Sequence, residues 1–208
     1  MTTVFNFTFV PWFRSVAPYI HKFRNQTFVV GIAGEAIAAG KLPHLAQDLA
    51  MIQSMGVKIV LVHGFRPQVN EQLRAKGHEA RYSHGMRITD EVALDCAQEA
   101  AGQLRYEIEA AFSQGLPNTP MAGSFMRVTG GNFLTAKPVG VVDGIDYGFT
   151  GAVRKVIADE IVADLDQQNV VLMSSLGVSP AGEIFNMSME AVAEAVAIAL
   201  KAEKLIYL

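Results

Sequence analysis

Apolar runs and helical apolar patterns alternate along this chain. Largely apolar runs, rich in β-branched residues, occupy 27–32, 58–62 and 169–173. Such runs are typical of strands buried in a parallel sheet. Between them, apolar residues recur three or four positions apart, as on one face of a helix. The alternation predicts an α/β fold with a mostly parallel sheet flanked by helices.

The predicted helices have recognisable ends. They cover about 42–55, 67–75, 90–112, 156–166 and 189–202. Gly56 and Gly77 follow the first two as stop signals. Thr89 is the expected N-cap of the third helix and Ser188 of the last, because a hydroxyl oxygen can accept from a free N–H of the first turn.

The middle of the chain predicts antiparallel structure. Segment 82–89 is read as irregular and 115–123 as a loop. Beyond that loop lie strand-like runs and turn sequences at 125–128, 130–132, 133–136, 139–142 and 143–146. Turns rich in Gly, Asn and Asp between such runs are typical of hairpins. We expect one or two hairpins here, forming a flap attached to the parallel sheet.

The start of the chain predicts a helix and its end predicts a strand. Segment 1–24 is read as an N-terminal helical segment and 25–208 as one domain. Segment 183–186 predicts a short strand or turn. The final apolar run, 204–208, predicts a strand that simply stops, which suggests a chain cut on its C-terminal side within a larger fold.

The leading segment carries an apolar face. Four residues fall on one side of the predicted helix: Phe13, Val16, Ile20 and Phe23. Pro18 either kinks this helix or marks its start. The apolar face could dock onto the chain's own core. It could equally form a contact between subunits of a homo-oligomer, since an aromatic stripe outside the alternating pattern is typical of an interface.

Composition excludes several classes of partner. Half of the 208 residues are hydrophobic, 18% are charged, and the net charge is -3. No basic run is interleaved with aromatic residues, so we expect no nucleic-acid partner. No signal peptide or bilayer-spanning stretch is recognisable, so we expect no membrane association. The single cysteine, Cys96, is read as a small buried apolar residue, in keeping with a reducing cytoplasmic compartment.

Candidate ligand contacts follow the predicted strands. Right-handed crossovers place the loops after Ile32, Val62 and Met173 on one edge, where ligands bind in open α/β sheets. Gly64 could let backbone N–H groups approach an anion, or could serve only chain reversal. Arg66 and Arg87 could each hold a carboxylate through the planar guanidinium fork. We favour a solvated surface position for Arg66 and ligand contact for Arg87.

The other polar candidates predict little chemistry. His63 has no partner at metal-ligand spacing and is read as a hydrogen-bonded core histidine. Asn132 and Asn186 occupy turn positions, where Asn is common for backbone reasons alone. No catalytic triad, phosphate-binding loop or dinucleotide fingerprint is recognisable. The residues alone predict a crevice for a small acid, with no catalytic residue, cofactor or metal site.

Several stretches together resemble the amino acid kinase fold. Within it, they resemble the acetylglutamate kinase-like part of bacterial N-acetylglutamate synthases. In chain order, the matching stretches are Ala17-Pro18-Tyr19-Ile20, Val30-Gly31-Ile32-Ala33-Gly34, Leu61-Val62-His63-Gly64, Gly85-Met86-Arg87-Ile88-Thr89-Asp90, the block from Gly131 to Gly144, Val153-Arg154-Lys155 and Ala202-Glu203-Lys204-Leu205-Ile206-Tyr207-Leu208. The similarity covers nearly the whole chain.

The resemblance implies a lost phosphotransfer activity. In the kinases, a lysine at the end of the first strand stabilises the transferring phosphoryl group, and Gly31 matches that position. Phe65 and Arg66 stand where the kinases have glycines over the phosphates, and both would crowd a phosphate. Glu190 stands where they have an aspartate. A working kinase is therefore not expected.

The resemblance also implies a ligand pocket. Arg87 matches the arginine that holds the carboxylate of the acylated amino acid, and Asn186 matches an asparagine of the same site. With Gly64, these residues form the expected pocket of an acyl-amino-acid ligand. The pocket could survive as a relic or still bind a ligand.

The synthases suggest a role for the chain. In them this domain binds L-arginine as feedback inhibitor and builds the oligomer with help from the N-terminal helix. A following GNAT-type domain transfers the acetyl group from acetyl-CoA to glutamate, the first step of arginine biosynthesis. We therefore expect a regulatory part of such a protein, inactive alone, with acetyl-CoA as co-substrate of the parent. The alternatives are an acetylglutamate kinase and a stand-alone arginine- or acetylglutamate-binding or oligomerisation module.

Overall fold

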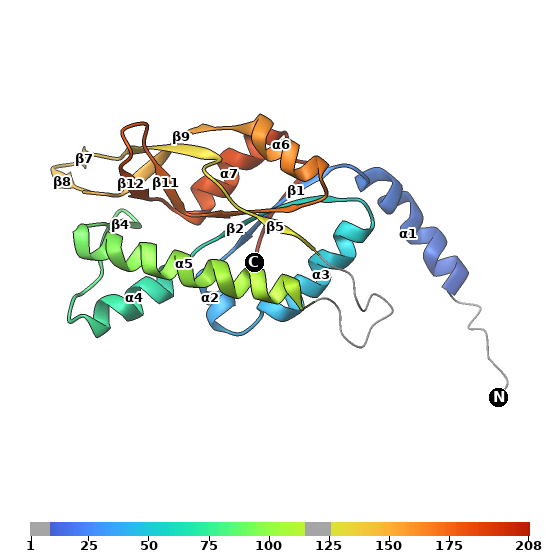
Figure 1. Ribbon diagram of the computed structural model, residues 1–208, viewed down its shortest axis with the longest axis horizontal. Coiled ribbons are helices and arrows are strands. Elements are labelled where there is room, and N and C mark those ends of the chain that lie inside the picture. The colour runs from blue at the N-terminus through green and yellow to red at the C-terminus, as the bar shows by residue number, and fades with distance from the viewer. Residues whose placement is uncertain (1–8, 115–125) are drawn as a thin grey trace.

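The computed structural model describes residues 9–114 and 126–208, which form a layered α/β structure (Figure 1). The described helices are α1 (Phe9–Phe23), α2 (Gly34–Ala38), α3 (Leu42–Ser54), α4 (Arg66–Ala75), α5 (Glu91–Ser113), α6 (Ala158–Asp166) and α7 (Met189–Leu200). All five helices predicted after the leading segment are present. The short helix α2, at the end of the first strand, was not predicted.

The main sheet is parallel and has the order β13-β1-β2-β10-β5. Its strands are β13 (Lys204–Tyr207), β1 (Thr27–Ile32), β2 (Lys58–His63), β10 (Val170–Ser174) and β5 (Val128–Thr129). Because β1, β2 and β10 are parallel neighbours, their carboxyl ends meet at one edge, as predicted. The loops that follow these strands therefore lie together.

A second sheet, of order β12-β11-β6-β9, is largely antiparallel and carries the predicted flap. Its strands are β12 (Ile184–Asn186), β11 (Leu176–Val178), β6 (Leu134–Pro138) and β9 (Gly151–Val156). Two hairpins accompany it: β3 (Arg81–Ser83) with β4 (Met86–Ile88), and β7 (Val141–Val142) with β8 (Ile145–Asp146). The turn of the second is the predicted Asp143-Gly144.

Several sequence expectations are corrected here. Segment 82–89, read as irregular, contains the hairpin β3–β4. The turn at 130–132 closes no hairpin, because β5 and β6 belong to different sheets. Val156 ends strand β9 rather than starting a helix. The predicted loop at 115–123 and the start of the run at 125 lie outside the described residues.

Two hydrophobic clusters cover the two faces of the main sheet. Along β2, Ile59 and Leu61 point into the cluster formed with α2 to α5, whereas Val60 and Val62 point into the cluster formed with α6, α7 and the second sheet. Figure 1 shows these two groups of elements on opposite sides of the sheet. This pattern explains why the strand is apolar from Ile59 to Val62. Cys96 is fully buried in the first cluster, as predicted.

Helix caps fix where the site-forming elements begin. Ser188 caps α7 as predicted, with its hydroxyl accepting from the Ala191 N–H at 3.0 Å. The cap of α5 is Asp90 rather than the predicted Thr89: its carboxylate accepts from the Ala93 N–H at 2.9 Å. Thr89 is fully buried and engaged in tertiary contacts. The start of α5 is therefore shifted by one residue.

Helix α1 lies apart from the core. It runs continuously through Pro18, so it does not start there, and none of its residues is buried. Its aromatic side chains are open to solvent, with Trp12 59% exposed. Only its C-terminal end meets the core, where the Phe23 and Phe28 rings lie edge-on with centroids 5.4 Å apart. Of the two alternatives for the apolar face, burial of the whole face in the chain's own core is therefore not observed. Across the described parts of the chain, no helix is both long enough and apolar enough to cross a membrane.

Candidate functional site at the carboxyl edge of the main sheet

A cavity of about 270 Å³ lies where β1 and β2 end. The loops after these strands line it, together with the β3–β4 hairpin, the start of α7 and parts of the second sheet. Gly64, Arg87 and Asn186 all line this cavity, which we call the crevice. The structure therefore brings together the three predicted ligand residues. Asn132 lines a different cavity, on the α5 side of the sheet.

Arg87 is a buried cation that has no counter-ion within the described parts of the chain. The residue is only 8% exposed. One guanidinium nitrogen, Nη2, donates to Asn70 Oδ1 at 2.7 Å and to the Arg66 carbonyl at 3.3 Å. The other, Nη1, is buried and has no partner among the described residues. Burial lowers the pKa of Arg87, but a guanidinium remains protonated at neutral pH. An anion bound in the crevice would supply the missing charge.

A tyrosine stands between two arginines at the mouth of the crevice. The guanidinium carbon of Arg87 lies 4.9 Å from the Tyr82 ring centroid, and that of Arg66 lies 5.8 Å from it. Tyr82 also donates its hydroxyl to Asn70 Oδ1 at 2.9 Å. Arg66 is exposed as predicted, yet it lines the crevice. The ring lets two like charges stand near each other through cation–π contacts.

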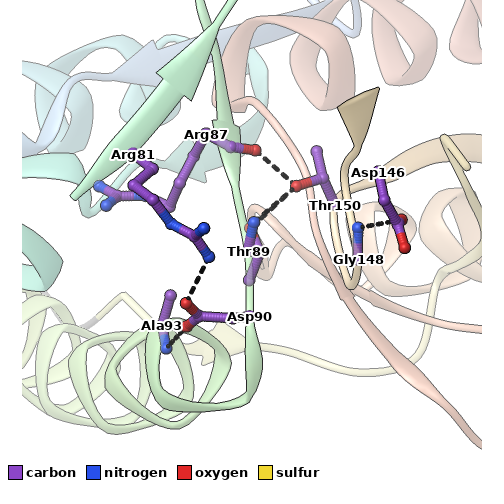
Figure 2. Close-up of polar contacts among 8 residues, drawn as sticks. All are labelled: Arg81, Arg87, Thr89, Asp90, Ala93, Asp146, Gly148 and Thr150. Atoms are coloured by element: carbon purple, nitrogen blue, oxygen red, sulfur yellow. Dashed lines mark hydrogen bonds and ion pairs between the residues drawn. The ribbon is translucent and has the colours of Figure 1, made fainter. Parts of the chain in front are cut away.

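A buried hydroxyl network holds Arg87 and Asn186 in place. Figure 2 shows the part of it formed by Arg87, Thr89 and Thr150. The Thr150 hydroxyl donates to the Arg87 carbonyl at 2.5 Å and lies 3.0 Å from Thr89 Oγ1. It also accepts from the Thr89 N–H at 3.2 Å. The Asn186 amide donates to Thr89 Oγ1 at 3.2 Å. The network ties the β3–β4 hairpin to the second sheet and so fixes one wall of the crevice.

The glycines of the crevice serve close packing. Gly64 donates its N–H to the Ile32 carbonyl at 2.9 Å, so this donor is not free for an anion. A Cβ atom at Gly64 would lie 3.3 Å from Met189 Cβ, which is a tight contact. Phe65 turns into the core, where its ring meets the His63 ring edge-on at 6.2 Å between centroids. Of the two residues expected to crowd a phosphate, only Arg66 is exposed at the crevice.

Gly31 is packed even more closely. A Cβ atom there would lie 2.6 Å from Met189 Sδ and 2.8 Å from Tyr207 Cδ1. Both distances are shorter than carbon or sulfur atoms normally approach. A side chain at this position would require the Met189 and Tyr207 side chains to move. The space that a side chain of residue 31 would need is therefore filled.

Two carboxylates also line the crevice. Glu35 belongs to the first turn of α2 and Glu190 to the first turn of α7, and both are exposed. Within residues 9–114 and 126–208, neither forms an ion pair. The same ranges hold no group of three or more His, Cys, Asp or Glu residues arranged for a metal ion.

His63 is the last residue of β2, lines the other cavity on the α5 side of the sheet, and is 1% exposed. Burial lowers its pKa to about 4, and a contact with the Gly64 backbone opposes that shift. Its Nδ1 atom has no hydrogen-bond partner in the described part of the chain. The predicted core position is confirmed, but the predicted hydrogen bond is absent at this atom.

The sequence did not reveal several residues of the site. Asn70, Tyr82, Thr89 and Thr150 shape the crevice, and none has a residue pattern that indicates it. Thr89 was predicted from its position and hydroxyl group, but as the N-cap of a helix rather than as a residue of the site. These residues come from separate elements, and only their meeting in space identifies them.

Comparison with known proteins finds a matching family model and similar curated proteins. A family model described as the amino acid kinase family matches residues 26–208. The amino-acid acetyltransferase of Ralstonia nicotianae is 54% identical over 200 residues, which is 96% of this chain and 44% of that protein. The enzyme of the same name from Ectopseudomonas mendocina is 46% identical over 198 residues, which is 95% of this chain and 46% of that protein. The chain thus spans somewhat less than half the length of these curated relatives.

Solved structures agree with this result. The N-acetylglutamate synthase of Neisseria gonorrhoeae, in complex with coenzyme A and L-arginine, matches with a TM-score of 0.90 and 39% identity over 96% of this chain and 47% of that chain. Giardia carbamate kinase matches with a TM-score of 0.60 and 16% identity over 88% of this chain and 72% of that chain, a likeness of fold alone.

Proposed function

This chain belongs to the amino acid kinase family, and we propose that it is the N-terminal regulatory domain of an amino-acid acetyltransferase. The parent protein would acetylate L-glutamate with acetyl-CoA to give N-acetylglutamate, the first step of arginine biosynthesis. Similarity to acetyltransferases over nearly the whole chain supports this proposal. Acetyl-CoA would then be a co-substrate of the parent protein, acting outside this domain.

The packing at Gly31 carries the proposal that this domain performs no phosphotransfer. In the transition state of phosphoryl transfer, the phosphoryl group carries negative charge that cations must stabilise. Met189 and Tyr207 fill the space that a cationic side chain at position 31 would need. Glu35 and Glu190, which line the same crevice, would repel a phosphate. The alternative of an acetylglutamate kinase is therefore disfavoured.

We propose that the crevice is a binding site rather than a catalytic one. The Arg87 guanidinium would hold a ligand carboxylate, and Asn186 and the Gly64 turn would border the ligand. The site needs no metal ion for this role. A bound carboxylate would supply the counter-ion that the buried Arg87 lacks.

The regulatory part of the proposal concerns L-arginine and assembly. The Neisseria synthase was solved with L-arginine, and we propose L-arginine as the allosteric ligand of the intact domain. We further propose a homo-oligomer in which segment 1–24 makes subunit contacts, while 25–208 forms the kinase-like domain. The exposed aromatic face of α1 supports this assignment. A cytoplasmic location is proposed on the single, unpaired and buried Cys96.

Two assays test the proposal. The 208-residue chain, given ATP, Mg²⁺ and N-acetyl-L-glutamate, should release no ADP above background, while an acetylglutamate kinase run in parallel should. The full-length parent protein should transfer acetyl from acetyl-CoA to L-glutamate, with a rate that responds to L-arginine. Phosphorylation by the chain, or a parent protein without acetyl transfer, would refute the proposed function.

A further inference from the structure

A second cavity, which we call the α5-side cavity, lies on the other face of the main sheet. Its volume is about 440 Å³, and among the described residues it shares no lining residue with the crevice. Along β2, Ile59 and Leu61 point into the cluster that includes α5. His63, two residues beyond Leu61, points to the same side and lines this cavity. The α5-side cavity is therefore separate from the crevice.

Small residues of α5 leave room for this cavity. The helix lines it with Gln98, Ala101, Gly102 and Arg105. Their spacing places them in one stripe along the helix. A Cβ atom on Gly102 would meet nothing within 4 Å. From Gln98 to Arg105 the helix rises by about 10 Å, at ~1.5 Å for each residue. The stripe thus has a neutral amide at one end, a cation at the other and little side-chain bulk between them.

The Arg105 end of the cavity favours an anion. Arg105 Nε donates to Glu109 at 2.8 Å, and its Nη groups donate to no residue in the described ranges. The guanidinium lies over the turn after β5, because a Cβ atom on Gly130 would lie 3.7 Å from Arg105 Cζ. In that turn, the N–H groups of Gly131 and Asn132 also have no acceptor within 9–114 and 126–208. No carboxylate is among the described lining residues. A guanidinium beside free N–H groups matches a ligand carboxylate.

The His63 end of the cavity favours a neutral hydrogen-bonding group. His63 is the register partner of Ser174 on β10, and Gly130 follows β5 on the other side of that strand. Two strand spacings, roughly 10 Å, therefore separate His63 from Gly130. His63 is buried, and its Nδ1 has no partner in the described chain. Because burial lowers its pKa to about 4, the ring is uncharged at neutral pH and forms a hydrogen bond rather than an ion pair.

We propose that the α5-side cavity binds an extended small carboxylic acid whose carboxylate meets Arg105 and whose neutral polar tail meets His63. The apolar side chains that line the cavity, among them Leu172, Leu176 and Ile184, suit an aliphatic chain. A chain of about five or six carbon atoms, with a hydrogen bond at each end, covers the distance between the two polar ends. This inference does not depend on the function proposed for the crevice.

NMR titration of the 208-residue chain tests this inference with matched probes. The probe 6-hydroxyhexanoate carries the carboxylate, the chain and the polar tail. Hexanoate lacks the tail, 1,6-hexanediol lacks the charge, and acetate lacks the chain. We expect 6-hydroxyhexanoate to shift the Gly131 amide and His63 ring signals until they saturate, and to bind about tenfold more tightly than each comparison probe. No saturable shift below about 10 mM, or equal affinity for any comparison probe, would overturn the inference.

Two variants show whether the shifts come from this cavity. Arg105→Gln removes the cation, and we expect the affinity to fall by about fivefold or more. Gly102→Leu fills the cavity from an open helix position, so it should abolish binding without loss of stability in urea unfolding. Arg74→Gln is the matched control and should bind as the unchanged chain does, since Arg74 is exposed and does not line the cavity. Unchanged affinity in either cavity variant would refute the assignment.

Discussion

Tyr207 lies against Gly31 across two parallel neighbouring strands. The two residues are register partners of β13 and β1, and a Cβ atom on Gly31 would lie 2.8 Å from Tyr207 Cδ1. The Tyr207 hydroxyl continues over the sheet edge and donates to the Glu190 carbonyl at 3.2 Å. The absence of a side chain at residue 31 therefore lets an aromatic ring connect the edge strand to the start of α7.

Gly31→Ala should destabilise the fold. The added methyl group would overlap Met189 Sδ and Tyr207, and overpacking of this kind costs about 1–3 kcal/mol. Gly102→Ala is the matched control, because a Cβ atom there would meet nothing within 4 Å and the position is inside α5. That control should be neutral or more stable by up to ~1 kcal/mol. Urea unfolding measures both, and equal stability of the two variants would contradict the packing described here.

The same contact can be tested by compensation. Tyr207→Ala removes one of the two groups that a Cβ atom at residue 31 would overlap. The double variant with Gly31→Ala should therefore lose less free energy of unfolding than the sum of the single losses. Such a coupling is expected for residues in contact, whereas distant independent sites add. Simple additivity would show that the two sites act independently.

Thr150→Val should lower the free energy of unfolding, because it removes hydrogen bonds that hold one wall of the crevice. The change keeps the shape of the side chain but removes bonds to the Arg87 carbonyl and to Thr89. Buried groups left without partners cost about 1–3 kcal/mol each. Thr129→Val is the matched comparison, because its buried Oγ1 has no partner in the described chain. It should be neutral or stabilising in the same unfolding assay, and the reverse ranking would refute the network.

His63 should make stability depend on pH. Its pKa is about 4 in the folded chain and has the ordinary value of 6.5 when unfolded. Between these values the unfolded state binds more protons, so stability falls as pH drops from 6.5 towards 4. The total loss is roughly 3 kcal/mol, at about 1.4 kcal/mol for each pH unit. His63→Gln should flatten this slope in urea titrations from pH 7 to pH 5, whereas the exposed His44→Gln should retain it.

Helix α1 should control assembly. Trp12 and Phe13 are exposed on it, so changing both to Ser leaves the core intact. We expect the double variant to show a lower mass by light scattering at an unchanged thermal midpoint. Deletion of residues 1–24 should have the same effect. An unchanged mass in both variants would contradict the proposed role of this segment in subunit contacts.

Local pattern was sufficient for most elements. The uniformly apolar runs predicted β1, β2 and β10, because strands covered on both faces can be apolar at every position. The spacing of apolar residues predicted α3 to α7, with boundaries shifted by one or two residues except where β9 takes the start expected for α6. Ser188 capped α7 as expected because its partner is only three residues away. Such features depend on neighbours in sequence.

Tertiary contacts decided the rest. Thr89 has the residue type of a cap, but its hydroxyl forms hydrogen bonds with Thr150 and Asn186. Asp90 is therefore the N-cap of α5. The aromatic face of α1 has a helical pattern, yet only the fold places it away from the core. Short strands such as β3, β4 and β11 are held by partners distant in sequence or by turns with little pattern of their own.

The sequence by itself predicted the main strands and helices in their order, and it named Gly64, Arg87 and Asn186 as candidate residues of one pocket. Only the tertiary structure placed these residues around one cavity and filled the space at Gly31 with Met189 and Tyr207. It also left Arg87 without a counter-ion among residues 9–114 and 126–208. The reason is physical: secondary structure follows from local periodicity, whereas burial, charge balance and free volume depend on groups that meet only when the chain has folded.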